Sequence, residues 1–425
     1  MAKFTLRTLG PVHIGNGVRY SPFEFFYDEN KLFLIPDHTM IALSARAPDL
    51  LARYICGEVR DQKDTSLLEF LKVQNLLVAA KQKATRLDVP EHTVHFLNKP
   101  IKKAQEIHAT MHTLGSDSSV TSGPYVPGTS LKGAIITAVL SHMVMADTQL
   151  RLELVKAAEK LGNLRYPDAR TAGDCLQRLL DMVFGPKALP AGYDNMRPNY
   201  SALRFLEVGD SQAVSSGASF AAAVLVTEWH SNRDVPWGFD NFVIWQEAIR
   251  PGIQLDGTRV TVRENLYSKK GQLEYRLSQE LSEPSAGFSA EVALRRLKQI
   301  LHEEALRVLD EELSYFKQAA SCKQEDMRPR AKQVVEQLEE IRSQSTPSSP
   351  VVRIGADQGL LSTTLARIVR DKAPQAYTPM SITSQKIRGA KYRDAENANF
   401  PITRRICKVP GGKYASFGWC KLVPE

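Results

Sequence analysis

Tyr125-Val-Pro-Gly-Thr-Ser-Leu-Lys-Gly-Ala-Ile-Ile-Thr-Ala-Val-Leu140 is the stretch that says most about the fold of this chain. Its proline-glycine pair predicts a tight turn, Thr129 or Ser130 a helix N-cap, and the apolar residues that follow a helix. Lys132 places a cation where the helix dipole favours an anion, and Gly133 costs backbone entropy inside a helix. A phosphate bound by Ser130, Lys132 and Gly133 would explain these residues. An ordinary capped helix with an exposed lysine is the alternative.

The same stretch also suggests a nucleotide-binding loop, because Gly123 to Ser130 spells G-x-x-x-x-G-T-S. In that loop a lysine grips the phosphates directly after the second glycine. Thr129 stands in its place here. The sequence therefore argues against an NTPase.

Length and composition predict a globular protein of two or three domains, since the chain has 425 residues, of which 43% are hydrophobic and 24% charged. Its five cysteines show no C-x-x-C spacing, which argues against structural zinc and disulfides and favours free thiols in a cytoplasmic protein. We expect no cofactor. The first residues already alternate as a strand, so we expect no signal peptide, and the apolar run 134–146 is too short to span a bilayer.

The positive charge is concentrated near the C-terminus. Residues 386–421 contain nine Lys or Arg but two acids, Asp394 and Glu396, so this stretch carries most of the net charge of +8. Clustered basic charge is typical of proteins that bind a polyanion, although a solvated basic face is the alternative. On charge alone, the candidate contacts are Lys386, Arg388, Arg404 and Arg405.

The order of strand and helix patterns predicts an α+β protein with an RRM- or ferredoxin-like core. Strands are expected at 3–9, 23–27, 31–35, 203–208, 220–227, 242–249 and 259–263. Helices are expected at 131–146, in a second helical region that continues from there to about 161, at 290–316 and at 331–342. The last two helices are separated by a break at Met327-Arg-Pro-Arg330.

The domain organisation follows from the same patterns. We predict a core over 1–287 with helical insertions at about 41–118 and 147–198, a helical hairpin over 288–342, a linker over 343–350 and a basic α+β region over 351–425. The linker is rich in Ser and Pro.

The sequence contains two histidine patterns that could carry chemistry, a possible metal site and a possible general base. His108 and His112 have the spacing of zinc ligands on a helix, but Ala109 stands where a metalloprotease needs Glu, so no metal site is expected. His13 lies between Gly10 and the turn Gly15-Asn-Gly17, where backbone N–H groups can approach a ligand. It could act as a metal-independent general base on a ribose hydroxyl, with Lys132 stabilising the transition state. Alternatively it hydrogen-bonds the turn or stacks on a base, and binding without cleavage is the favoured interpretation.

Three motifs together resemble the RAMP superfamily of CRISPR RNA-binding proteins: Pro11-Val-His-Ile-Gly-Asn-Gly17, Pro127-Gly-Thr-Ser-Leu-Lys-Gly133 and Leu203-Arg-Phe205. Further motifs narrow the resemblance to the fifth-numbered subunit family of type III-A (Csm) effector complexes. They are Glu247-Ala-Ile-Arg-Pro-Gly252, Ile354-Gly-Ala-Asp-Gln-Gly-Leu-Leu-Ser362, Thr403-Arg-Arg405 and Phe417-Gly-Trp419.

This resemblance implies RRM-like folding and a place near the 3′ end of the CRISPR RNA (crRNA). It also implies neighbouring RAMP subunits as partners and a role in crRNA maturation together with host nucleases. Sister subunits that cut target RNA use an aspartate after the first glycine turn, and residues 18–24 contain none, so cleavage is not expected. In the family the glycine turn and the helix start contact the RNA backbone. The corresponding residues here are His13, Gly15, Asn16, Gly17, Ser130, Lys132 and Gly133.

Overall fold

The computed structural model describes most of the chain. The described residues are 2–21, 24–35, 39, 41, 43, 45, 67–91, 93, 106–113, 123–165, 168–185, 201–229, 237–263, 276–283, 287–358, 365–387 and 403–425. They form a mixed α+β fold with two sheets and a set of helices, so the predicted α+β class is confirmed.

One antiparallel sheet joins the two ends of the chain. Its strand order is β11-β14-β1-β10-β7, and each neighbouring pair is antiparallel. The strands are β11 (Val351–Arg353), β14 (Trp419–Pro424), β1 (Ala2–Thr8), β10 (Gln254–Val262) and β7 (Leu206–Val208). In β1, Phe4 and Leu6 are buried whereas Lys3 and Arg7 are exposed, which is the alternation of a strand with one covered face.

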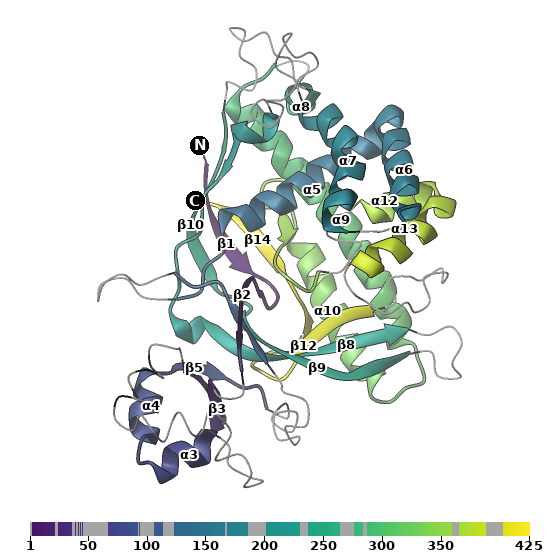
Figure 1. Cartoon of the computed structure of the whole chain (residues 1–425). Helices are drawn as coiled ribbons and strands as arrows, with labels where there is room; N and C mark the ends of the chain where they lie inside the picture. The colour runs from purple at the N-terminus through teal and green to yellow at the C-terminus, as the bar shows by residue number, and fades with distance from the viewer. Residues whose placement is uncertain are drawn as a thin grey trace.

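Two long helices cover one face of this sheet (Figure 1). They are α5 (Gly128–Ala146) and α9 (Ala290–Ala320). Leu131, Ile135 and Ile300 of these helices are fully buried in one core with Phe4 and Leu6 of the sheet. Five further helices gather beside α5: α6 (Thr148–Gly162), α7 (Ala169–Phe184), α8 (Arg276–Glu280), α12 (Ala366–Lys372) and α13 (Pro374–Ile387).

The second sheet has the order β2-β6-β9-β8-β5-β4-β3, and β12 and β13 join it through β8. Its strands are β2 (Gly15–Tyr20), β6 (Ile107–Thr110), β9 (Trp237–Ile249), β8 (Ser219–Trp229), β5 (Thr85–Asp88), β4 (Lys31–Leu34), β3 (Phe25–Asp28), β12 (Thr403–Lys408) and β13 (Tyr414–Ser416). The hairpin predicted around residues 28–30 is confirmed: Glu29 and Asn30 have positive φ in the turn between β3 and β4.

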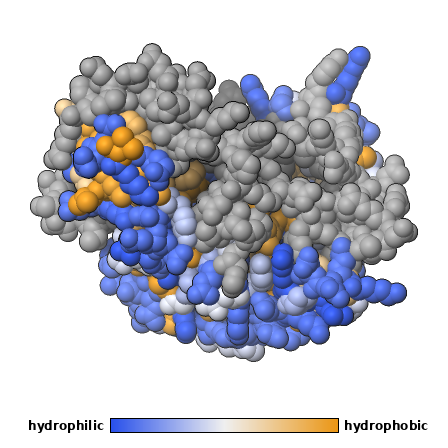
Figure 2. Space-filling model, turned by 90° about the horizontal axis from the view of Figure 1, so that it is seen from below, coloured by the Kyte–Doolittle hydropathy of each residue, from blue (hydrophilic) through white to orange (hydrophobic). Residues whose placement is uncertain are grey.

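A small lobe projects from one end of this second sheet (Figure 1). In it α3 (Leu67–Val73) and α4 (Leu77–Lys83) pack on β3 and β4 around a core that includes Phe26, Phe33 and Leu71. Val73 and Val78 are exposed, and Figure 2 shows hydrophobic residues beside hydrophilic ones on the part of the molecule seen from below.

Several boundaries differ from those predicted. The region 41–118 was expected to be helical, but its described part also contains β5 and β6, which pair with strands far away in sequence. A short 3-10 turn, η3 (Ala202–Phe205), occupies much of the strand predicted at 203–208. The break predicted at 327–330 is wrong because α10 (Met327–Gln344) begins there. Pro329 fits its first turn, where backbone N–H groups have no partner inside the helix.

The Ser- and Pro-rich segment 343–350 leads from α10 directly into β11. Ser345 is buried, and its hydroxyl accepts a hydrogen bond from the backbone N–H of Val351 (3.2 Å) and contacts His302 Nδ1 (2.8 Å). The strand that follows this segment, β11, belongs to the sheet that holds β1. The proposed division into domains stays a prediction.

By length and composition alone, α5 is the one helix in the described part of the chain that could cross a membrane. A core helix of a globular protein passes the same test. Leu131, Ile135 and Val144 of α5 are fully buried among residues of the sheet and of neighbouring helices, so packing inside the protein accounts for its apolar character.

Candidate functional site

A cleft of about 470 Å³ opens beside the start of α5. One wall is the outer face of α5, with Thr129, Ser130 and Gly133. The opposite wall is formed by Gly15 and by the turn after β11, and α9 closes the floor. The further lining residues are Ile14, Ala134, Thr137, Ala138, Leu301, Glu304, Ala305, Val308, Val351, Val352, Arg353, Gly355, Ala356, Gln358 and Trp419. The structure thus brings together two motifs that lie more than one hundred residues apart in the sequence.

The start of α5 is capped differently from the prediction. Pro127 is the N-cap residue, so the expected cap at Thr129 or Ser130 is wrong. The carboxylate of Asp210 accepts a hydrogen bond from the Gly128 N–H at 2.7 Å. An anionic side chain therefore already occupies the helix terminus where the sequence suggested a phosphate. Gly128 is required for packing, because a Cβ there would lie 2.2 Å from the Val208 carbonyl oxygen.

Lys132 and Gly133 have separate roles. Lys132 Nζ donates to the Leu203 carbonyl oxygen at 2.8 Å, so its charge is held at the 3-10 turn η3. Lys132 is not among the residues that line the cleft. Gly133 is exposed on the cleft wall, and a Cβ built there would meet no atom within 4 Å. Of the two, Gly133 is the one that leaves room for a ligand.

His13 is a buried anchor of the glycine-rich turn. Its side chain is 3% exposed, and its Nδ1 lies 2.7 Å from the Glu247 carbonyl oxygen. Since a carbonyl only accepts, Nδ1 carries the proton and donates. The His13 carbonyl oxygen in turn accepts from the Ala356 N–H at 2.8 Å. A side chain enclosed in this way is not placed to contact an RNA backbone or to act as a general base, which corrects both expectations.

The turn after His13 is the exposed part of this motif. Gly15, Asn16 and Gly17 begin β2 and are all exposed at the edge of the second sheet. Gly17 has φ of +86°, a conformation that favours glycine, and the Asn16 side-chain oxygen accepts from the Val18 N–H at 2.8 Å. These three residues remain available to a ligand.

The four basic candidates near the C-terminus are not equivalent. Arg404 is 5% exposed, and its Nε donates to Glu312 at 2.6 Å, so it is not available to a phosphate. Arg405 is partly exposed and pairs with the buried carboxylate of Asp357. Lys386 belongs to α13, but its side chain, like the whole of Arg388, lies outside the described residues.

Arg353 is a cleft residue that the sequence reasoning missed. It lies in β11 with a buried side chain, and its guanidinium stacks 4.9 Å from the Trp419 ring centroid and lies 3.3 Å from Glu312. The only sequence signal was an arginine in a short apolar strand, where an unpaired charge would be costly.

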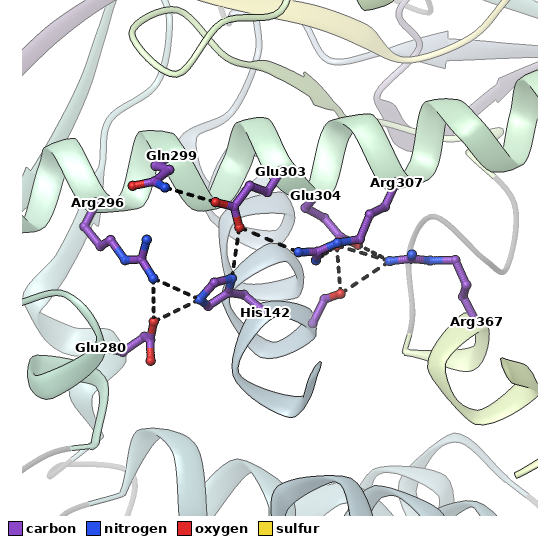
Figure 3. A network of polar contacts seen from close by, with 9 residues as sticks. His142, Glu280, Arg296, Gln299, Glu303, Glu304, Arg307 and Arg367 are labelled. Atoms are coloured by element: carbon purple, nitrogen blue, oxygen red, sulfur yellow. Dashed lines mark hydrogen bonds and ion pairs between the residues drawn. The ribbon is translucent and has the colours of Figure 1, made fainter. Parts of the chain in front are cut away.

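A polar network between helices fixes the cleft floor (Figure 3). The Glu304 carboxylate of α9 accepts from Ser141 of α5 (2.8 Å), Arg307 (3.0 Å) and Arg367 of α12 (2.9 Å). Next to Ser141, His142 bridges Glu280 and Glu303, at 2.9 Å and 3.4 Å. Helices α5, α8, α9 and α12 are therefore linked, so the outer face of α5 is held in place against α9.

Glu247, whose backbone anchors His13, also binds a second histidine. His112 Nε2 lies 2.8 Å from the Glu247 carboxylate, which is 2% exposed. Burial lowers the pKa of His112, but the hydrogen bond and the charge of Glu247 outweigh it, so the pKa is raised overall. His108 lies in strand β6, not in a helix. Among the described residues, no group of three or more His, Cys, Asp or Glu is arranged to hold a metal ion.

Burial lowers the pKa of His13 below its ordinary value, against the opposing effect of its hydrogen bond to Glu247. The folded protein therefore favours the neutral imidazole, and this contribution to stability is complete above about pH 6.5 and is lost as the pH falls through the folded pKa. We expect the parent to lose more stability than His13→Asn between about pH 7.5 and 5.5. Thermal unfolding at both pH values measures this, and equal losses would contradict it.

No protein-family profile matches the chain. Over 142 residues, or 33% of this chain, the sequence is 28% identical to the CRISPR system Cms protein Csm5 of Streptococcus thermophilus. The match spans 38% of that relative, which is well under two thirds of its length.

Two solved structures share the fold over the whole chain. A chain from the cryo-EM structure of a Csm-crRNA-target RNA ternary complex of a type III-A CRISPR-Cas system has a TM-score of 0.67 at 19% identity, covering 100% of both chains. The crystal structure of T. onnurineus Csm5 has a TM-score of 0.59 at 19% identity, covering 98% of this chain and 99% of that one.

The fold is therefore that of a subunit of type III-A CRISPR effector complexes. Within this class, the sequence relative and one of the two structures are Csm5, and it is Csm5 that this chain resembles. The resemblance inferred from the sequence motifs is confirmed.

Proposed function

We propose that this chain is a non-catalytic crRNA-binding subunit of a type III-A Csm complex. It lies at the crRNA 3′ end, contacts neighbouring RAMP subunits and takes part in crRNA maturation with host nucleases in the cytoplasm. The likeness to a chain of a Csm-crRNA-target RNA complex over its full length supports this proposal. The sequence match to a Csm5 supports it independently.

A ferredoxin-like RAMP core is part of the proposal. In chain order, β1, α5, β7, β10, α9 and β14 alternate as strand, helix, strand, strand, helix, strand. Their order in the sheet, β14-β1-β10-β7, is antiparallel throughout and has both helices on one face. This arrangement favours the split βαβ unit that gives the ferredoxin-like fold its name. The strand β11 then extends one edge of the sheet.

The RNA path is proposed along the cleft beside α5. The observation that carries it is the meeting of Gly15 with Ser130 and Gly133 around one open cleft. Small residues on both walls allow a sugar-phosphate backbone to approach the protein backbone closely. The hydroxyls of Thr129 and Ser130 are donors of the kind that contact phosphate and ribose oxygens. Contacts to phosphate and sugar carry no sequence information directly, so this contact would be independent of sequence.

RNA binding should weaken steeply as salt is raised, because phosphate contacts release counterions. Fluorescence anisotropy with a labelled crRNA at several salt concentrations measures this.

Assembling Csm complexes with and without this chain tests its place in the complex. We expect particles formed without it to carry crRNA that is not trimmed to its mature 3′ end. Identical crRNA lengths with and without the chain would contradict the proposed role in maturation.

The alternative, a metal-independent endoribonuclease with His13 as base, makes a different prediction. Purified protein would cut repeat RNA in EDTA, and His13→Ala would abolish the cut. We expect intact RNA in both cases, because the His13 ring is buried and a general base must come within hydrogen-bond distance of the hydroxyl it deprotonates. Cleavage by the parent alone would favour the nuclease.

A further inference from the structure

The open face of the five-stranded sheet carries two pairs of like charges. Lys3 of β1 lies directly opposite Arg259 of β10, and Arg7 of β1 lies directly opposite Lys421 of β14. Residues opposite each other in an antiparallel pair have Cβ atoms about 5 Å apart, and like charges at that distance destabilise a sheet. Lys3, Arg7 and Arg259 are exposed and Lys421 is half-buried.

The acidic residues on the same face do not neutralise these pairs. Asp256 accepts a hydrogen bond from Thr5 Oγ1 at 2.7 Å, and Glu207 forms an ion pair with Arg263. Glu425, whose backbone N–H donates to the Lys3 carbonyl oxygen at 3.1 Å, uses its carboxylate to accept a hydrogen bond from the Gly257 N–H at 3.3 Å. In the part of the chain that the structure describes, no ion pair or side-chain hydrogen bond joins Lys3, Arg7, Arg259 or Lys421 to an acid. Four cations thus share the three central strands of one sheet face.

We propose that this face, named here the basic sheet face (Lys3, Arg7, Arg259 and Lys421), binds the phosphate backbone of a single-stranded RNA. This inference rests on the proposed function and adds a second RNA-binding surface to the cleft. It lies on the opposite side of the sheet from α5 and α9, and α5 forms one wall of the cleft. Lys3 and Arg7 are separated by about 13 Å along β1, so the face spans more than one phosphate.

The chemistry of the face favours RNA phosphates over bases and over a protein partner. Thr5 lies between Lys3 and Arg7 in β1 and Thr261 follows Arg259 in β10, both half-buried, and neither strand exposes an aromatic ring on which a base could stack. The core of a protein interface is apolar. Among the described residues, no exposed large hydrophobic side chain lies in β1, β10 or β14.

Two double variants test the face: Lys3→Gln/Arg259→Gln and Arg7→Gln/Lys421→Gln. Each phosphate contact adds roughly 0.7 to the slope of log affinity against log salt for a single strand, so losing two contacts should weaken binding about 25-fold at about 0.1 M salt and reduce the slope by about 1.4. Removing each like-charge pair should leave stability unchanged or higher. Lys323→Gln/Lys332→Gln removes the same charge elsewhere and should change affinity less.

Anisotropy with a labelled single-stranded RNA, thermal unfolding and the cleft variant Gly133→Glu complete the experiment. Loss of affinity in both face variants without loss of stability supports the basic sheet face. Parent-like RNA binding by both face variants overturns it, and if Gly133→Glu alone is then impaired the proposed function still stands. Reduced binding of poly-glutamate with unchanged RNA binding also overturns it, in favour of an acidic protein partner. No RNA binding by the parent overturns both proposals.

Discussion

Gly133→Glu is expected to weaken RNA binding at least tenfold while leaving the protein folded. A Cβ at this position meets no atom within 4 Å and Gly133 lines the cleft, so a side chain can start there without displacing the backbone. A carboxylate there would face the phosphates of a bound backbone, and like charges brought together in an interface cost several kcal/mol. A loss of about 1.4 kcal/mol already corresponds to tenfold in affinity.

Gly133→Ala is the matched control. Alanine in the middle of a helix is more favourable than glycine by about 0.5–1 kcal/mol, so this variant should be slightly more stable than the parent. A methyl group occupies little of a cleft of about 470 Å³, so RNA affinity should change by less than threefold, or about 0.6 kcal/mol. Anisotropy and thermal unfolding on the same preparations measure both quantities. Unchanged affinity in Gly133→Glu would remove α5 from the RNA path.

The sequence predicted most elements of the fold because their patterns are local. The alternation in 3–9, the turn at 28–30 and the apolar face of 290–316 each depend on neighbours within a few residues, and each is present. Strands β5 and β6 were missed because they are short and flanked by polar sequence, and all their partners are distant: β4 and β2 lie at least fifty residues earlier, and β8 and β9 more than one hundred residues later. Pairing at that separation leaves no local signal.

The site was predicted in part for the same reason. Gly15, Ser130 and Gly133 belong to motifs that are recognisable in the sequence, and the structure places them around one cleft. His13 and Lys132 belong to the same motifs, but their side chains are held by the carbonyl oxygens of Glu247 and Leu203, which are distant in sequence. The motifs therefore predicted which backbone segments meet, but they did not predict which groups the side chains of those segments contact.

Counting charges along the chain was also insufficient. The C-terminal excess of Lys and Arg pointed to Arg404, which is buried beside Glu312, whereas the basic sheet face takes its four cations from β1, β10 and β14. Two of these strands lie far outside the C-terminal stretch. The cations meet only because the first and last strands of the core are neighbours in one sheet. The pairing register of β1 with β10 and β14 places the four cations on one face, and the sequence does not show that register.

Arg404→Ala and Glu312→Ala are each expected to destabilise the protein by about 3–5 kcal/mol, because each removes one partner from a buried cluster of hydrogen-bonded charges. The side chains of Glu312, Arg353 and Arg404 are 2%, 5% and 5% exposed. The Glu312 carboxylate lies between the two guanidiniums, at 2.6 Å from Arg404 Nε and 3.3 Å from Arg353 Nη1. The Arg404 guanidinium also stacks 4.5 Å from the ring centroid of Tyr315.

Denaturant unfolding of these variants beside Arg342→Ala distinguishes a structural role for Arg404 from an RNA-binding one. Arg342 pairs with Asp310 on the surface, where both side chains are well exposed, so its loss should cost less than about 1 kcal/mol. Because Arg353 joins the cleft to this buried pair, loosening Glu312 should also weaken RNA binding indirectly. An Arg404→Ala protein that is as stable as its parent but deficient in RNA binding would instead indicate that Arg404 contacts RNA.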